Sequence, residues 1–197
     1  MRLNILIAGA AGQGINEISN ILAKALACAG YYIFNYREYG SLIAGGHNFN
    51  ALSVSDSPIY SHENDFDIVI ALNEDAVKRY SKNFKKDALI LASQDYKIKK
   101  SLEGTSGCSE KRSFSDIKNS IKVEIDNNKI ENVYYAAALF KILGLDKSIL
   151  VEYINKIFAG KAWLKADLEA VDKTYKKDYG INLGLNDNGK TKHVFTG

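Results

Sequence analysis

The first thirty residues change from an apolar run to a glycine-rich turn and then to a helical pattern. Apolar side chains fill residues 3–8 except at Asn4, and the turn that follows reads Gly9-Ala10-Ala11-Gly12-Gln13-Gly14. Apolar residues then recur at helical spacing, at Ile15, Ile18, Leu22, Ala25 and Leu26. This order predicts a strand, a tight turn and a helix, the unit with which nucleotide-binding α/β domains begin.

Further apolar runs predict the other strands of a sheet. Residues 31–34, 67–73 and 87–92 have the composition of buried strands, and residues 121–125 alternate as a strand near a sheet edge does. A short helical pattern separates 67–73 from 87–92. Both of these strands are therefore expected to run parallel to the first one, through right-handed crossovers.

One segment departs from the alternation of strands and helices. Residues 49–55 alternate between two faces, Asp56-Ser57-Pro58 is typical of a turn, and residues 59–61 resemble a short strand. We expect 49–55 and 59–61 to form a hairpin, which would make the sheet mixed.

The last third of the chain is helical. Amphipathic patterns predict helices over 133–143, from a cap at Asp146 to 158, and over about 162–179, each followed by a glycine. Residues 181–197 are polar and predict a linker or tail behind a single domain of residues 1–180. The predicted fold class is α/β: a Rossmann-like three-layer sandwich whose mostly parallel sheet carries a β-hairpin insertion, followed by C-terminal helices.

Composition narrows the classes of function. The chain has 197 residues, a net charge of +3 and 46% hydrophobic residues, which suits one globular domain and lacks the dense basic face of a nucleic-acid-binding protein. Cys28 and Cys108 are the two cysteines; neither has metal-ligand spacing, and Cys28 is expected to be a buried thiol. No segment is long and apolar enough for a signal peptide or a membrane span, so the expected location is the cytoplasm.

The glycine turn is the leading candidate for chemistry. Glycines allow a sharp turn close to a ligand, and the free N–H groups of a helix start attract anions. The spacing is G-x-x-G-x-G rather than the dinucleotide fingerprint G-x-G-x-x-G, and Glu38 is displaced from the fingerprint's acidic position. Three interpretations stay open: a turn that only allows close packing, a site for a phosphate-bearing ligand, and an NAD site.

Two other segments carry polar groups without regular structure. Residues 35–50 form a long polar connection that contains Gly45, Gly46 and His47. Connections of this length in a compact domain often carry function, so this segment is a candidate. Residues 95–113 are basic and glycine-containing, which indicates either a solvated loop or a docking patch for an acidic partner. No nucleophile elbow, Cys–His pair or kinase-like motif is present, which favours a binding or assembly domain over a self-sufficient enzyme.

Four segments in order resemble one family, the gamma subunits or gamma domains of 2-oxoacid:ferredoxin (acceptor) oxidoreductases. The helical stretch 132–145 is similar as well, so that the resemblance covers about residues 1–180. The four segments are Gly9-Ala10-Ala11-Gly12-Gln13-Gly14-Ile15, Tyr39-Gly40-Ser41-Leu42-Ile43-Ala44-Gly45-Gly46-His47-Asn48, Ser53-Val54-Ser55-Asp56-Ser57-Pro58-Ile59-Tyr60-Ser61 and Asp67-Ile68-Val69-Ile70-Ala71-Leu72-Asn73. Many relatives have a basic residue where this chain has Ala44, which weakens a phosphate contact at that point.

The resemblance implies a large enzyme, acting on pyruvate, ketoisovalerate, 2-oxoglutarate or a similar acid, that decarboxylates its substrate and releases an acyl-CoA. It places thiamine diphosphate, Mg and the 4Fe–4S clusters in partner domains, and leaves coenzyme A as the ligand that this chain would approach. The implied site residues are Gly9, Gly12, Gln13, Gly14, Gly45, Gly46 and His47, with no catalytic or metal-binding residue.

The resemblance also implies how the chain is assembled. The expected partners are the alpha, beta and delta parts of the complex, ferredoxin through that complex, and a dimer or higher assembly, without nucleic acid or membrane. The terminus Val194-Phe195-Thr196-Gly197 resembles the junction of fused versions, so the chain is expected to be the N-terminal part of a longer alpha subunit, inactive alone. The alternatives are a stand-alone nucleotide- or NAD-binding protein and a purely structural assembly subunit.

Overall fold

A computed structural model describes residues 1–38, 46–95, 119–185, 192 and 194–196. The described residues form one seven-stranded sheet in the order β6-β5-β4-β1-β3-β2-β7. The strands are β1 (Arg2–Ala10), β2 (Tyr32–Glu38), β3 (His47–Ser55), β4 (Phe66–Ala71), β5 (Phe84–Ser93), β6 (Ser120–Val123) and β7 (Val194–Thr196). The α-helices are α1 (Ile15–Cys28), α2 (Glu74–Tyr80), α3 (Glu131–Ile142), α4 (Lys147–Ile157) and α5 (Leu164–Lys176).

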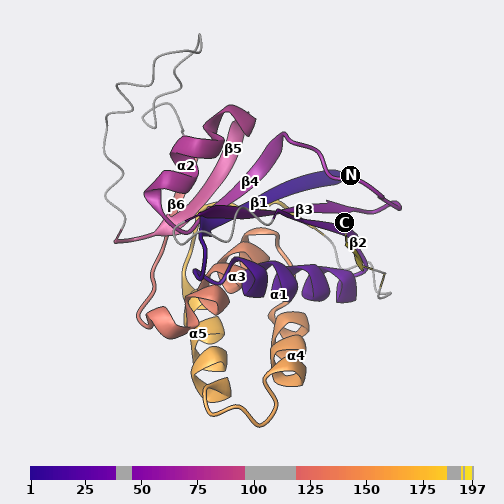
Figure 1. The fold of residues 1–197 in the computed structure, drawn as a ribbon. Helices are drawn as coiled ribbons and strands as arrows, with labels where there is room; N and C mark the ends of the chain where they lie inside the picture. Colours follow the sequence, from indigo (N-terminus) through magenta and orange to yellow (C-terminus); the bar gives the residue numbers. More distant parts are fainter. Residues whose placement is uncertain (39–45, 96–118, 186–191, 193, 197) are drawn as a thin grey trace.

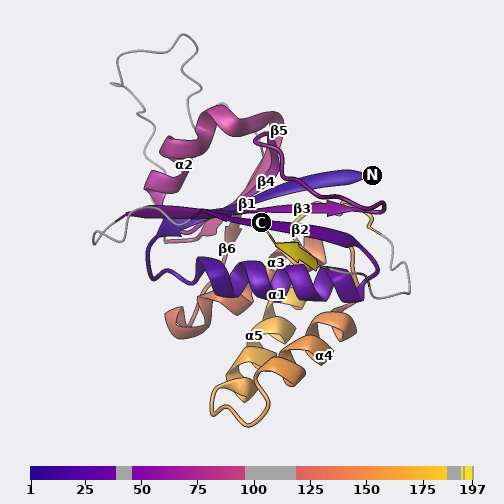
Figure 2. The same ribbon diagram turned by 45° about the vertical axis from the view of Figure 1, so that its right-hand side comes forward.

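Helices cover both faces of this sheet, which makes three layers (Figures 1 and 2). Helix α2 lies on one face, and α1, α3, α4 and α5 lie on the other. Strands β1, β4, β5 and β6 pair in parallel, as predicted for residues 67–73 and 87–92, and β6 lies at the sheet edge, as predicted for residues 121–125. The α/β class and the mostly parallel, mixed sheet are thereby confirmed.

The antiparallel strand of the mixed sheet has partners other than those expected. Strand β3 lies between β1 and β2 and runs antiparallel to both. The predicted hairpin of 49–55 with 59–61 is wrong, because residues 59–61 form no strand. Both edges of β3 are already hydrogen-bonded, by β1 on one side and β2 on the other, so no edge remains for a third partner.

Strand β2 is longer than its apolar run, which suggested an end at Phe34. It continues to Glu38 because its whole length pairs with β3, from Tyr32 opposite Ser55 to Glu38 opposite Phe49, with the polar side chain of Asn35 buried inside it. The Ser19 hydroxyl on α1 donates to Asn35 Oδ1 at 2.8 Å. This bond satisfies the Asn35 carbonyl oxygen, whereas Asn35 Nδ2 is buried without a hydrogen-bond partner among the described residues, so the strand pairing with β3 offsets the cost of this amide.

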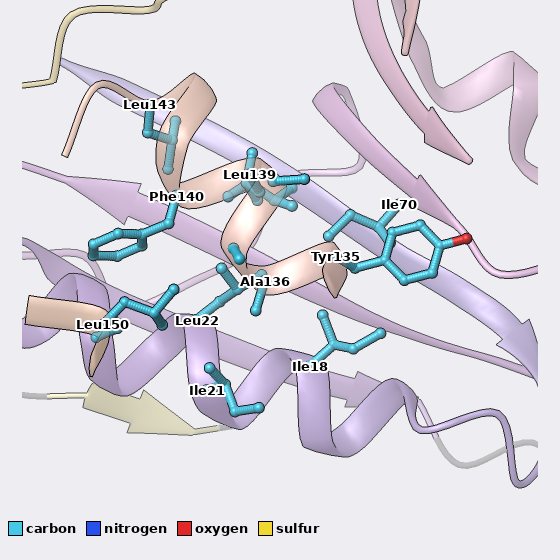
Figure 3. Close-up of a cluster of buried hydrophobic side chains, with 14 of the residues drawn as sticks. Ile18, Ile21, Leu22, Ile70, Tyr135, Ala136, Leu139, Phe140, Leu143 and Leu150 are labelled. Atoms are coloured by element: carbon cyan, nitrogen blue, oxygen red, sulfur yellow. The ribbon is translucent and has the colours of Figure 1, made fainter. Parts of the chain in front are cut away.

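The main core lies between the sheet and the four helices on its lower face in Figure 1. Helix α3 is buried nearly all the way round, because α1, α4 and α5 pack against it on the sheet. Figure 3 shows Tyr135 and Phe140 of α3 among side chains of α1 such as Ile18 and Leu22. Truncating any of these fully buried side chains to alanine is expected to cost about 2–5 kcal/mol. A smaller core fills the space between α2 and the opposite face of the sheet.

Two further predictions concern the cap of α4 and the burial of a cysteine on α1. Asp146 caps α4 as predicted, since its Oδ1 accepts from the Ser148 N–H at 2.6 Å. Cys28 was expected to be buried and is exposed. It continues a row at i+4 spacing with Asn20 and Lys24, and this row is the solvent face of α1.

The residues that follow Gly180 contact the domain at several points. The Leu183 and Leu185 N–H groups donate to the Ile142 and Leu143 carbonyls at 2.8 and 2.7 Å, and β7 pairs in parallel with β2. The separation into a domain of residues 1–180 and a linker of residues 181–197 stays a prediction. The predicted basic segment 95–113 lies outside the described residues except for Asp95.

Candidate functional site

The glycine turn connects β1 to α1 and leaves backbone donors open. Gly12 and Gly14 have φ values of 91° and 76°, in the left-handed region that favours glycine. Gly14 is the N-cap of α1 and offers no side-chain cap, and the first helical bond runs from Ile18 N–H to Gly14 C=O at 3.0 Å. The N–H groups of residues 15–17 therefore lack intrahelical acceptors and give this end of the helix a partial positive charge.

The side chain of Gln13 holds this turn against the turn that follows β4. Its Oε1 accepts from the Ala10 N–H and from Asn73 Nδ2, each at 2.6 Å, and its Nε2 donates to the Leu72 carbonyl at 3.0 Å. Gly9 makes this arrangement fit, because a Cβ at position 9 would lie 2.8 Å from both Gln13 Oε1 and Leu72 Cβ. Gly9 and the Gln13 side chain thus fix the shape of the turn.

A pocket of about 390 Å³ opens in front of the turn, at the carboxyl ends of β1 and β2. This is the edge at which open α/β sheets bind ligands. The N-termini of two long helices, α1 and α3, face the pocket. Its lining consists of residues 11–17 together with Glu38, Asn48, Asn50, Asn128, Lys129, Glu131 and Asn132.

Charge is distributed unevenly in this pocket. Lys129 is the one cationic side chain of the lining, whereas Glu17, Glu38 and Glu131 are acidic. Burial raises the pKa of Glu131 above its ordinary value of 4.5. The backbone donors of the turn and Lys129 are the groups that favour an anion, the three carboxylates oppose one, and the asparagine amides suit uncharged polar groups.

The turn has room for a ligand at its outer side. A Cβ added at Gly12 would meet nothing within 4 Å, so the backbone there borders open space. On the far wall, Asn50 Nδ2 donates to Asn16 Oδ1 at 3.0 Å, which joins β3 to the first turn of α1. The pocket is thus open beside Gly12, and the hydrogen bond between Asn50 and Asn16 holds β3 against α1 at its side.

The structure brings three of the predicted site residues to the pocket and places the others elsewhere. Gly12, Gln13 and Gly14 line the pocket, whereas Gly9 lies behind it. Gly46 contacts the turn from the side, because its carbonyl accepts from the Ala11 N–H at 3.1 Å. Gly45 lies outside the described residues.

His47 lies on the other side of the sheet. Its ring lies near Tyr80 of α2, with 6.5 Å between the ring centroids, while the next side chain, Asn48, lines the pocket. Burial, with a smaller contribution from Arg79, lowers the pKa of His47. A neutral imidazole on the α2 face cannot supply charge to a ligand in front of the turn.

Several lining residues escaped the sequence reasoning. Asn128 and Lys129 lie between the edge strand β6 and α3, and Glu131 and Asn132 begin α3, more than a hundred residues from the glycine turn. The rule that ligands lie at the carboxyl ends of parallel strands could have indicated them. Asn48 and Asn50 could have been found as alternate polar positions at the start of β3.

Two further findings concern metal-ligand groups and membrane-spanning helices in the described residues. No group of three or more His, Cys, Asp or Glu side chains within them could hold a metal ion. In the same part of the chain, none of the helices combines the length and the apolar character that crossing a bilayer requires.

Comparison with known proteins agrees with this architecture. The family model described as "Pyruvate ferredoxin/flavodoxin oxidoreductase" matches residues 4–177. A "2-oxoacid:ferredoxin oxidoreductase subunit alpha" from Sulfolobus sp is 30% identical over 89% of this chain and 33% of its own length. The corresponding subunit from Saccharolobus solfataricus is 26% identical over 84% of this chain and 32% of its own length. The chain thus spans about one third of these relatives.

Solved structures with the same fold include a 2-oxoglutarate:ferredoxin oxidoreductase from Magnetococcus marinus, with 2-oxoglutarate, coenzyme A and succinyl-CoA bound. It superimposes with a TM-score of 0.72 at 20% identity, over 96% of this chain and 34% of that chain. The gamma subunit of a keto/oxoacid ferredoxin oxidoreductase from Geobacter sulfurreducens gives a TM-score of 0.68 at 20% identity, over 90% and 96% of the two chains. From the family match over residues 4–177, the chain belongs to the pyruvate ferredoxin/flavodoxin oxidoreductase family.

Proposed function

We propose that this chain is the non-catalytic, coenzyme A-binding domain of a thiamine-diphosphate-dependent 2-oxoacid:ferredoxin oxidoreductase. In such an enzyme the carboxylate of the 2-oxoacid leaves as carbon dioxide, ferredoxin takes up the two electrons of the oxidation one at a time, and the acyl group is joined to the coenzyme A thiol. The observation that carries the proposal is the pocket in front of an uncapped α1 N-terminus, bordered by Gly12 and Gly14.

The residues of the pocket fit one end of coenzyme A. The N–H groups of the first turn of α1 would hold a phosphate, and Lys129 would neutralise part of its charge. Glu17, Glu38 and Glu131 disfavour further phosphates in the same space. The uncharged amide and hydroxyl groups of the ligand would therefore lie along Asn48, Asn50 and Asn132.

Thiamine diphosphate, magnesium and the clusters would be held by partner domains. This chain's contribution would be to bind and orient the acyl acceptor at the glycine turn, and its described residues contain no group of side chains that could hold a metal ion. The support for a multisubunit enzyme is that the relatives are themselves called subunits.

The test is the assembled enzyme carrying Lys129→Gln, with Lys122→Gln as control, because Lys122 is an exposed lysine on β6 outside the pocket. A charge-assisted contact to phosphate is worth about 1.5 kcal/mol, so we expect about a tenfold higher KM for coenzyme A in the variant. The KM for the 2-oxoacid and the kcat should not change. Gly12→Val, which would fill the open side of the turn and strain its φ of 91°, should also raise the KM for coenzyme A.

If both pocket variants keep the wild-type affinity for coenzyme A, the chain serves assembly without a ligand. The affinity is measured by calorimetry on the assembled enzyme as well as from the KM. These two readouts separate weaker binding from slower turnover.

A stand-alone NAD-binding protein is the second candidate, and the position of Glu38 favours it. This carboxylate ends β2 and lines the pocket, as the ribose-binding acid of a dinucleotide fold does. However, β3 lies between β1 and β2, so Glu38 is one strand further away, about 5 Å more. NAD(H) binding that is tighter than coenzyme A binding, and lost in Glu38→Gln, would establish this alternative.

A further inference from the structure

The connection between α4 and α5 extends to the end of the molecule that is farthest from the sheet (Figures 1 and 2). We call residues 155–166 the hairpin tip. Nearly every residue of the tip is exposed, and the partly buried ones, such as Phe158 and Leu164, pack against the main core. The tip is therefore a projection whose base packs against the main core.

Large apolar side chains lie on the outside of this tip. Trp163 is the only tryptophan of the chain and is 49% exposed, and Ile157 is 37% exposed. Packing within the hairpin does not explain their presence, because Phe158 and Leu164 already fill that role. Exposed tryptophans surrounded by polar groups are the residues on which protein interfaces depend most.

The charge of the tip has one sign. Lys156, Lys161 and Lys165 are exposed, and no Asp or Glu occurs within residues 155–166. Lys161 Nζ lies 5.9 Å from the centroid of the Trp163 ring, so a cation and an apolar surface are presented together. The nearest ion pair, Lys165 with Glu169, is long at 3.9 Å and exposed, and such pairs contribute little.

We propose that the hairpin tip docks on an acidic protein surface with an apolar centre, on another subunit or domain of the oxidoreductase. Trp163 and Ile157 would enter the apolar centre, and the lysines would pair with the acidic rim. None of the tip residues lines the pocket in front of the glycine turn, so this surface is distinct from the coenzyme A site. The choice of a protein partner follows from the three exposed lysines of the tip, of which only Lys165 forms an ion pair within the described part of the chain, and from relatives that are subunits.

The test measures how tightly the tagged chain retains its partner subunits in the assembled complex as the salt concentration rises. Trp163→Ala is expected to weaken the association at least tenfold. The double variant Lys161→Gln/Lys165→Gln is expected to weaken it about threefold or more and to reduce its salt dependence, because screening acts on the lost ion pairs. Neither variant alters a fully buried side chain, and both should keep the wild-type KM for coenzyme A.

Two matched controls alter similar residues elsewhere. Tyr60→Ala removes an aromatic ring that is 72% exposed, and Lys78→Gln/Lys122→Gln removes two exposed lysines on α2 and β6. Both controls should retain the partner subunits as the wild type does. Amide exchange of residues 155–166 should also be slower in the complex than after the complex is dissociated by salt.

Three outcomes would overturn the proposal. They are partner retention within twofold of wild type in both tip variants, amide exchange at the tip that does not change on assembly, and Trp163-dependent binding to vesicles of anionic phospholipid without any effect on assembly. The last outcome would assign the tip to a membrane surface. A change in the KM for coenzyme A concerns only the pocket, so the two proposals fail independently.

Discussion

Asn73 Nδ2 donates a hydrogen bond of 2.6 Å to Gln13 Oε1, and this contact joins the turns that follow the parallel strands β1 and β4. Asn73 is at the same time the N-cap of α2, because its Oδ1 accepts from the Ala76 N–H at 2.9 Å. The glycine turn is therefore held by the neighbouring turn. A ligand in front of it would meet backbone groups that are already in place.

Replacing Gln13 by alanine should destabilise the fold. The Ala10 N–H, the Leu72 carbonyl and the Asn73 amide would each lose a partner in a partly buried place. We expect the free energy of unfolding to fall by about 2–3 kcal/mol. Urea unfolding measures this, with the exposed Gln94→Ala as control. A loss as small as that of the control would show that Gln13 does not hold the turn.

Gly9→Ala and Gly12→Ala should differ in the cause and size of their effects. A Cβ at position 9 would lie 2.8 Å from Leu72 Cβ and from Gln13 Oε1, so the surroundings must move, at about 1–3 kcal/mol. A Cβ at position 12 meets no atom within 4 Å, so the only cost is the strain of an alanine at a φ of 91°, which lowers the free energy of unfolding by about 1 kcal/mol. Thermal unfolding of the two variants tests this. Equal losses would contradict the close packing of Gly9.

Asp167 should make the protein less stable as the pH rises. Its carboxylate on α5 is 1% exposed, both oxygens lack hydrogen-bond partners among the described residues, and burial raises its pKa from 3.8 to about 6. A raised carboxyl pKa means that the folded state holds a proton that the unfolded chain releases. Stability is therefore lost as the pH increases from about 4 through about 6, and the whole cost is present at pH 8.

We expect Asp167→Asn to stabilise the fold by roughly 1–3 kcal/mol at pH 8 and by less at pH 4.5. Denaturant unfolding at the two pH values measures the difference. Asp65→Asn, at an exposed carboxyl group, should have no effect at either pH. A gain from Asp167→Asn that is the same at pH 4.5 and pH 8 would show that the charge of Asp167 is not the cause.

Glu131 should make coenzyme A binding depend on pH. It lines the pocket with its pKa raised above 4.5 by burial, so its negative charge opposes a phosphate at higher pH and disappears as the pH falls through that raised pKa. Glu131→Gln should bind coenzyme A about three- to tenfold more tightly at pH 8, with less gain at pH 5. Because the ligand's own titration is the same for both proteins, the ratio of their affinities isolates Glu131. A ratio that stays constant with pH would contradict this role.

The sequence alone determined the strand–turn–helix opening, the parallel strands before and after α2, the edge strand β6 and the Asp146 cap. Each of these follows from residues close to one another in the chain. Apolar periodicity decides which face is buried, and a cap needs only a side chain two or three residues before its N–H. The family was also readable, because its motifs are local and occur in a fixed order.

Only the tertiary structure decided which strands are neighbours and which side chains meet. The insertion of β3 between β1 and β2, the extension of β2 past Asn35, and the brace from Gln13 to Asn73 all depend on partners far away in the chain. The same holds for Lys129 and Glu131, which α3 brings to the glycine turn. His47 shows the limit most clearly: a strand places successive side chains on opposite faces, so the register of β3 put Asn48 in the pocket and His47 behind it.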